Sequence, residues 1–429
     1  MDLFPDEIVS IIINNASAHE LAQLSRTSKR LNRLTEPLLW TNIEFHHQSF
    51  HLLSDSRHPS PKTPAVQRFY CGEPDSEYSG ACKAEGFFNM LQDLLHENVD
   101  RLKQLCARVE SICTALSLDM NCWQFLPYFI NITSLELYGD PWDRYRGGHR
   151  PFDIPATLLT KLHYVRLDGE IPRHIVAWIL SSCASVERLE LALLDTGITT
   201  EETIEDDFPR FPEDIFTPPE YPEYGRLSGW AAIPRPLSNF LPCPEDWMSL
   251  KLPRLRHLHL CQPSQSNLSQ RMVSYFWSTT AEVAAHRDWE KILQASCATL
   301  ETLVVEQRIG MEHGDGACGE ADYFFRKDQD GLGSELLTNM LKRVMTERQS
   351  PALKRFYLRG IIVGSKTRGE PIGDVPGGRF MRFLERKGIE CEARFGEGLW
   401  FHGKEGLGPS PDWYSRDDEE IDEELLASV

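Results

Sequence analysis

The stretch Val186-Glu187-Arg188-Leu189-Glu190-Leu191 decides the fold, because its spacing of apolar residues returns along the chain. The pattern is L-x-x-L-x-L with apolar substitutions, and its alternation predicts a strand with one buried face. Copies start at residues 132, 162, 186, 255, 300 and 353, and Cys113-x-x-Leu116-x-Leu118 is an earlier copy. The recurrence predicts an array of repeats, which also suits a chain of 429 residues, too long for one ordinary core.

The segment before the strand repeats as well. Residues 179–187 resemble residues 292–301, and each segment is typical of a helix, then a cysteine, then a strand. The first two intervals between copies, 30 and 24 residues, are close to the length of a leucine-rich repeat. We therefore predict an α/β fold, with parallel strands and helices in a leucine-rich-repeat-like solenoid over residues 109–405.

The longer intervals between copies predict insertions. Residues 197–247 hold nine prolines between Pro209 and Pro244, so we expect a long and partly disordered surface loop there. Further loops are expected at about 309–333 and at Gly364–Gly378, and residues 406–429 are expected to be a disordered acidic tail. Residues 46–108 are predicted to be a linker and the first helix of the array, with an amphipathic helix from Phe87 to Leu105.

The first 45 residues are predicted to form a compact helical unit. An apolar run from Ile8 to Ile13 follows Pro5, with Asp6 and Glu7 where a helix N-terminus favours negative charge. A second apolar stripe has helical spacing and predicts one or two further helices. Pro37 predicts a break near Glu36. The stripe consists of Leu21, Leu24, Ser28, Leu31, Leu34 and Leu38.

This unit resembles the three-helix F-box. The family opens with Leu-Pro-x-Glu-Ile, and the chain has Phe4-Pro5-Asp6-Glu7-Ile8. The segment from Leu24 to Leu31 looks much like fungal F-box sequences, and Pro37-Leu38-Leu39-Trp40 matches the end of the motif. Phe4, Thr27 and Leu31 depart from the usual residues.

The resemblance implies a Skp-type adaptor as partner, and through it a cullin. It implies the substrate-recognition subunit of a ubiquitin ligase of the Skp–cullin–F-box class. A unit of ~45 residues rarely buries enough surface to be stable alone, which agrees with docking. The expected adaptor-binding residues are Phe4, Pro5, Ile8, Leu21, Leu24, Ser28, Leu31, Leu38 and Trp40.

The repeats resemble those of leucine-rich F-box proteins, in which the x positions of the strands face outward on a concave sheet that binds a protein substrate. One row is predicted to read Glu136, Arg166, Glu190, His259, Val304 and Tyr357 across neighbouring strands. Each of these residues could instead belong to a solvated ladder of charges. The expected substrate-binding residues are Glu136, Tyr138, Tyr164, Arg166, Arg188, Glu190, His257, His259, Arg355, Tyr357 and Arg359.

Composition argues against other classes of function. The chain has 45 basic and 64 acidic residues, so its net charge of −19 disfavours a nucleic-acid or anionic-membrane surface. No apolar run is long enough to span a membrane, and the acidic N-terminus is unlike a secretory signal. Eleven cysteines without a C-x-x-C motif indicate a reducing compartment, the cytoplasm or the nucleus.

No chemical motif is convincing, so we expect no catalysis, cofactor or metal. The segment 314–319 reads G-x-G-x-x-G but does not directly follow a strand, as a dinucleotide site requires. Asp328 begins a poor match to a calcium loop, and His46, His47 and His51 are more typical of an exposed linker. The basic and aromatic residues from Trp142 to Arg150 indicate a surface loop or a rim that contacts substrate.

Two alternatives to a ligase subunit remain open. The chain could be a repeat scaffold whose F-box serves a role outside ubiquitination. It could also be an enzyme built on the insertions at 197–247 or 309–333, for which no residue pattern gives support.

Overall fold

The structure is a computed structural model of the whole chain. It describes residues 4–16, 18–45, 80–116, 122–139, 159–169, 171, 173–182, 184–196, 232–237, 250–264, 279–309, 332–348, 350–359, 361, 363 and 375–394.

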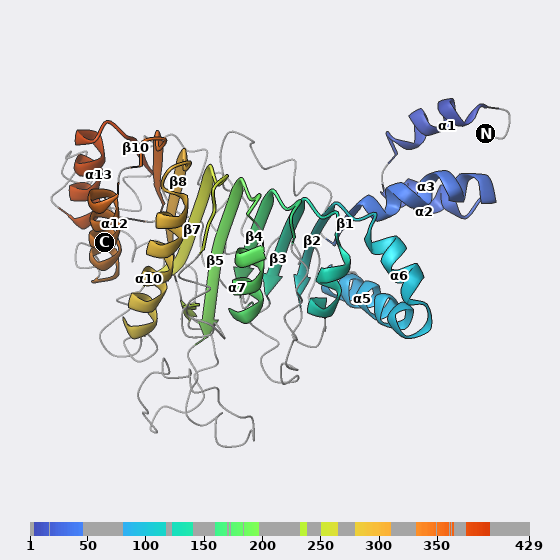
Figure 1. Cartoon of the computed structure of the whole chain (residues 1–429), viewed down its shortest axis with the longest axis horizontal. Coiled ribbons are helices and arrows are strands. Elements are labelled where there is room, and N and C mark those ends of the chain that lie inside the picture. The colour runs from blue at the N-terminus through green and yellow to red at the C-terminus, as the bar shows by residue number, and fades with distance from the viewer. Residues whose placement is uncertain are drawn as a thin grey trace, which may run out of the picture.

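One sheet organises these residues, and its strands lie in chain order (Figure 1). Each strand pairs in parallel with the next, except that β6 pairs antiparallel with β5 and leaves β5 and β7 as neighbours. The predicted α/β fold with parallel strands is therefore confirmed. The strands are β1 Asn42–Glu44, β2 Ser111–Leu116, β3 Ser134–Gly139, β4 Tyr164–Gly169, β5 Arg188–Thr196, β6 Ala232–Pro234, β7 His257–Ser264, β8 Thr302–Ile309, β9 Arg355–Arg359 and β10 Glu390–Arg394.

Helices lie between many of the described strands, and those after residue 80 share a buried core with one face of the sheet. Apolar strand residues such as Leu189 and Leu258 share a buried core with helix residues such as Ile179 and Ile292. The alternation of strand side chains turns the polar residues to the opposite face. The helices are α1 Asp6–Ile13, α2 Ala18–Ser25, α3 Lys29–Thr41, α5 Gly80–Glu97, α6 Val99–Cys106, the 3₁₀ helix η2 Cys122–Tyr128, α7 Arg173–Ser182, α10 Thr279–Ser296, α12 Leu332–Glu347 and α13 Pro376–Arg386.

The turn before each strand repeats the same backbone hydrogen bond. The amide of Thr133 donates to the carbonyl of Glu110 at 2.7 Å, and the amide of His163 donates to that of Thr133 at 2.8 Å. The series continues with the amides of Glu187, Arg256, Glu301 and Lys354, each donating to the equivalent residue one strand back. Before β10 the amide of Glu390 donates to the carbonyl of Lys354. Units of different length thus enter the sheet in one conformation, which explains why the L-x-x-L-x-L pattern survives the insertions between copies.

The N-terminal helices form a small core of their own. Val9 and Ile13 of α1 pack with Leu21 of α2 and Leu31 of α3. The expected break at Pro37 is wrong, because α3 runs through Pro37 to Thr41. A proline inside a helix removes one backbone hydrogen bond and crowds the carbonyl of residue i−4, and packing of Leu34, Leu38 and Leu39 of α3 against the small core offsets that cost.

Three loop or helix assignments also need correction. Residues 232–237, inside the expected loop at 197–247, include β6, and Leu237 is buried in the main core. The expected helix from Phe87 to Leu105 is two helices, because Asn98 ends α5 and accepts a hydrogen bond from the amide of Arg101 as the N-cap of α6. The end of the expected loop Gly364–Gly378 belongs to α13, which begins at Pro376.

Candidate functional site

An exposed apolar face on α1 is the most unusual surface of the N-terminal helices. Ile8, Ile11 and Ile12 are 44%, 61% and 43% exposed, and Phe4 just before the helix is 52% exposed. Their i, i+3, i+4 spacing puts the three isoleucines on one side of α1, while Val9 and Ile13 face the small core. The neighbouring helices α2 and α3 cover only the side of α1 that carries Val9 and Ile13, so its other apolar side stays in solvent.

Charged contacts hold the start of α1 in place. Nε of Arg30 on α3 donates to Oδ1 of Asp6 at 2.8 Å, and the guanidinium of Arg33 lies 3.2 Å from Oδ2. Arg30 also donates to the carbonyl of Phe4. The first turn of α1 is therefore fixed against α3, with its apolar side outward.

The expected adaptor-binding residues separate into surface and core. Phe4, Pro5 and Ile8 are exposed, whereas Leu21 and Leu31 are buried in the small core, with Leu24 and Leu38 packed against it. Sequence reasoning missed Ile11 and Ile12, although the all-apolar run that holds them was the signal. Oγ of Ser28 accepts a hydrogen bond from the amide of Leu31 at 3.2 Å, so this residue is the N-cap of α3.

The helices are joined firmly to the sheet. The chain passes from α3 into β1 without a linker, and β1 pairs with β2. Glu36 of α3 binds Arg101 of α6 and lies 3.1 Å from Arg108. Burial opposes the charge on Glu36, but the hydrogen bonds from the two arginines hold the pKa of its carboxyl below its usual value. Trp40 packs on the main core, with its ring centroid 5.8 Å from that of Phe87.

The polar face of the sheet carries the predicted row of charged residues. Glu136, Arg166, Glu190 and His259 are successive Cα partners on β3, β4, β5 and β7. Val304 and Tyr357 continue the row on β8 and β9, so the predicted register is confirmed.

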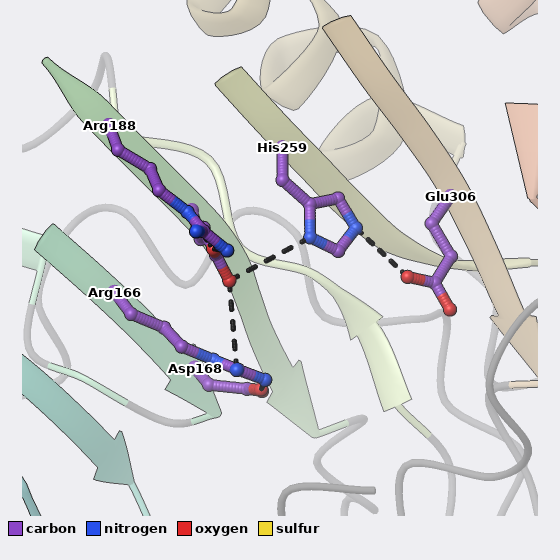
Figure 2. A network of polar contacts seen from close by, with 6 residues as sticks. Arg166, Asp168, Arg188, His259 and Glu306 are labelled. Atoms are coloured by element: carbon purple, nitrogen blue, oxygen red, sulfur yellow. Dashed lines mark hydrogen bonds and ion pairs between the residues drawn. The ribbon is translucent and has the colours of Figure 1, made fainter. Parts of the chain in front are cut away.

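The middle of this row belongs to a network of close charges (Figure 2). Glu190 binds Arg188 at 2.6 Å and lies 3.6 Å from Arg166, which is itself 3.6 Å from Asp168. His259 lies between two carboxylates. Its Nδ1 is 4.0 Å from Glu190, and its Nε2 is 2.9 Å from Oε2 of Glu306 on β8.

Burial and charge act against each other in this network. Burial raises the pKa of Glu190, but the positive charge of Arg188 and the groups of His259 and Arg166 outweigh it, so the pKa lies well below its usual value. Burial also raises the pKa of Tyr164, whose ring lies under the guanidinium of Arg188 at 5.1 Å. Burial, then the charge of Arg188, lowers the pKa of His257.

The expected substrate face is less exposed than its sequence suggests. Adjacent strands are ~4.8 Å apart, so long side chains of opposite charge pack along the row and cover one another. Tyr164, Arg188 and His257 are half-buried, Arg355 is exposed, and the side chain of Tyr138 lies outside the described residues. The buried members of the expected set are Glu136, Arg166, Glu190, His259, Tyr357 and Arg359.

A second polar cluster lies where α10 packs near the end of β7. Nε2 of His286 is 3.1 Å from Oε1 of Gln262 and 4.0 Å from Glu282, and burial lowers the pKa of the imidazole to about 4. The carboxylate of Asp288 accepts a hydrogen bond from the amide of Leu237 at 2.6 Å. This cluster fixes the segment after β6 to α10, and no pattern in the sequence predicts it.

Comparison with known proteins identifies the N-terminal part. Residues 1–46 match the family model described as F-box-like, which takes in α1, α2, α3 and β1. The chain thus carries an F-box-like domain, followed by a mixed α/β part built on the parallel sheet. A search of curated proteins gives no significant match.

Several motifs and segments noted in the sequence are not part of the structure described above. His46, His47 and His51, the segment 314–319, Asp328, residues 142–150 and the acidic tail lie outside the described residues. None of the helices in the described ranges has the length and apolar composition needed to cross a membrane.

Proposed function

We propose that this protein is the substrate-recruiting subunit of a ubiquitin ligase of the Skp–cullin–F-box class. The F-box-like domain docks on a Skp-type adaptor, which links the chain to a cullin. The sheet and its helices act as a leucine-rich-repeat-like array that binds a protein substrate, in the cytoplasm or the nucleus. The chain itself performs no chemical step.

The apolar face of α1 carries the docking half of this proposal. It lies in a segment that matches the F-box-like family, and F-box domains generally bind Skp-type adaptors. Fully burying a large apolar side chain contributes about 1.5–3 kcal/mol relative to leaving it exposed. Covering Phe4, Ile8, Ile11 and Ile12 with a partner would therefore favour a stable complex.

The direct connection between α3 and β1 supports the second part of the proposal, that the chain presents a bound substrate to the ligase. A subunit that presents a substrate to another protein benefits from a fixed distance between its two binding surfaces. The continuous path from α3 into β1, with Glu36 bound to α6, provides such a spacing.

Partly exposed residues on the polar face are the best candidates for contact with the substrate. Tyr164, Arg188 and His257 are neighbours on β4, β5 and β7, and Arg355 extends their row on β9 beyond Thr302. Tyrosine and arginine make good anchors in protein interfaces. The buried row beside them, which includes Glu190, positions Arg188 for this contact.

The docking experiment compares co-purification of a Skp-type adaptor with the wild-type chain and with an Ile8→Asp, Ile11→Asp double variant. We expect the wild type to form a complex that the double variant loses, because aspartate cannot be buried without a partner. Ile130→Asp is the matched control, since Ile130 is 55% exposed but lies far along the chain, after η2. A folded wild-type chain that does not bind the adaptor would refute the proposal.

The ligase role needs a second measurement, because a scaffold could also bind the adaptor. Proteins whose lifetime in cells lengthens when the wild-type chain is replaced by the Ile8→Asp, Ile11→Asp variant are candidate substrates. We expect a His257→Ala, Arg355→Ala variant, which leaves the bond between Arg188 and Glu190 intact, to lengthen the same lifetimes while keeping the adaptor. Unchanged lifetimes with both variants would favour a scaffold.

A further inference from the structure

Three different metal-binding side chains meet on the polar face of β7 and β8. His259 and Cys261 are two residues apart on β7, so they project to the same side. Glu306 on β8 is the Cα partner of Cys261. One donor atom from each residue lies within 4.8 Å of the other two, and the three residues are 4%, 2% and 0% exposed.

These donors have the chemistry of a zinc site. Zn²⁺ is bound in proteins by thiolate, imidazole and carboxylate groups at about 2.0–2.3 Å, and tetrahedral donors are then roughly 3.3–3.6 Å apart. The imidazole Nε2 and Oε2 of Glu306 are already 2.9 Å apart. Small side-chain movements would bring Sγ of Cys261 into the same coordination sphere, and a thiolate disfavours Mg²⁺ and Ca²⁺.

The far side of the imidazole faces a carboxylate, which would have to move closer to form the hydrogen bond found in many zinc sites. A histidine that binds zinc commonly donates its other N–H to a carboxylate, which fixes the ring and the tautomer. Nδ1 of His259 faces Glu190 at 4.0 Å, and Glu190 is in turn held by Arg188 at 2.6 Å. With the metal on Nε2, the proton would be kept at Nδ1, toward Glu190.

The local charge balance is compatible with a cation. Arg166 and Arg188 lie against Glu190 and Asp168, on the β4 and β5 side of His259. Glu306 and a deprotonated Cys261 would together supply two negative charges to a divalent ion. Arg359, the Cα partner of Glu306 on β9, places a positive charge on the next strand and would lower the affinity.

We infer that His259, Cys261 and Glu306 form a binding site for a thiophilic divalent cation, with Zn²⁺ the best fit. The ion would join β7 to β8 inside the protein and act as a structural link. This site does not depend on the adaptor docking proposed above.

Cobalt(II) titration of the full chain tests the site, because Co²⁺ replaces Zn²⁺ in such sites and is coloured. We expect the metal-free wild type to develop a near-ultraviolet thiolate-to-cobalt band and visible d–d bands that saturate at equimolar Co²⁺. Added Zn²⁺ should remove both. Zinc should also raise the melting temperature, since the folded state brings the three ligands together and so binds the ion more tightly than the unfolded chain does.

Two variants and one control decide the outcome. Cys261→Ser should lose the thiolate band, and Glu306→Gln should weaken cobalt binding while keeping that band. Cys113→Ser should behave like the wild type, because Cys113 is another buried cysteine of the same sheet face but lies on β2. Circular dichroism checks that each variant folds, and Glu306→Gln decides alone if Cys261→Ser does not. Absence of both bands in the folded wild type, or a thiolate band that persists in Cys261→Ser, would overturn the site.

Discussion

Glu190 is a buried carboxylate that the folded state holds in its charged form. It lies against Arg188 and Arg166, and its side chain is 3% exposed. Removing one member of a buried charge group leaves the others without compensation, which costs about 3–5 kcal/mol. The residue is therefore more important for stability than the surface ion pairs around it.

The first prediction concerns Glu190→Gln. We expect the free energy of unfolding, measured with urea, to fall by about 3 kcal/mol. Glu187→Gln is the matched control, since Glu187 lies 3.8 Å from its partner His163 and both side chains are about half exposed. We expect the free energy of unfolding of this variant to change by no more than about 0.5 kcal/mol. Equal losses in the two variants would show that the network does not stabilise the fold.

The same carboxylate predicts an acid limb in stability. The pKa of Glu190 is lower in the folded state than its ordinary value of 4.5, so its contribution is complete above that pH and is lost as the pH falls through the folded pKa. We expect the wild type to lose stability more steeply below about pH 4.5 than Glu190→Gln does. Urea unfolding at several acidic pH values measures the difference, and parallel curves would contradict it.

The imidazole of His286 predicts a second pH dependence of stability, at a pH higher than that of Glu190. Burial lowers the pKa of its imidazole from 6.5 to about 4, so only the unfolded chain takes up a proton between these values. Stability should therefore fall by about 2 kcal/mol between pH 7 and pH 5. His286→Gln should be less stable at pH 7 but should lose this dependence. An equally steep fall in the variant would assign the effect to another group.

At the scale of single elements, caps decide where helices begin. Ser28 caps α3, and Ser28→Ala removes the only side-chain acceptor for the amide of Leu31 that the described contacts show. We expect hydrogen exchange of the amides in α1 to α3 to show that the free energy of opening of these helices falls by about 1 kcal/mol. Ser28→Asp keeps an acceptor and should recover most of it. An effect of Ser28→Ala on adaptor binding without loss of protection would instead mark Ser28 as a contact residue.

Elements also show how far the sequence could be interpreted. The register of β3 to β9 was predictable, because a side-chain period of two fixes which residues share a face once the copies of L-x-x-L-x-L are aligned. The earlier copy predicted at Cys113 is wrong, because β2 pairs Ile112 with Leu135 and so places Cys113 opposite Glu136. The burial of Arg166 and Glu190 was not, since a polar pattern does not show how neighbouring strands pair their charges. Likewise, the run from Ile8 to Ile13 predicts a helix but does not say which side remains in solvent. The strand β6 was hidden in a proline-rich segment, where its pairing with β5 depends on residues far away in the sequence.

At the scale of the whole molecule, the F-box-like domain and the sheet share structure. β1 lies within the F-box-like match but pairs with β2, and the rings of Phe45 and Phe87 are 5.4 Å apart across this junction. Removing residues 1–45 would therefore expose the edge of β2 and part of the main core.

This shared junction gives the last prediction. A chain that begins after residue 45 should show faster hydrogen exchange in β2, while β8, deep in the sheet, keeps its protection. A chain that begins at Ser28 retains α3 and β1 and should protect β2 nearly as well as the full chain does. Normal protection of β2 without residues 1–45 would mean that the two parts are energetically separate.

The order of the strands has a consequence for how the protein is made. Apart from β6, which pairs antiparallel with β5, each described strand adds to the edge formed by the strand before it in the sheet. That strand is always earlier in the chain. The polypeptide can therefore fold from its N-terminus while the ribosome is still adding residues, each new unit settling on a finished edge. The F-box-like domain precedes the rest of the sheet in the chain and leaves the exit tunnel before it, so the proposed adaptor could bind before β2 to β10 have been synthesised.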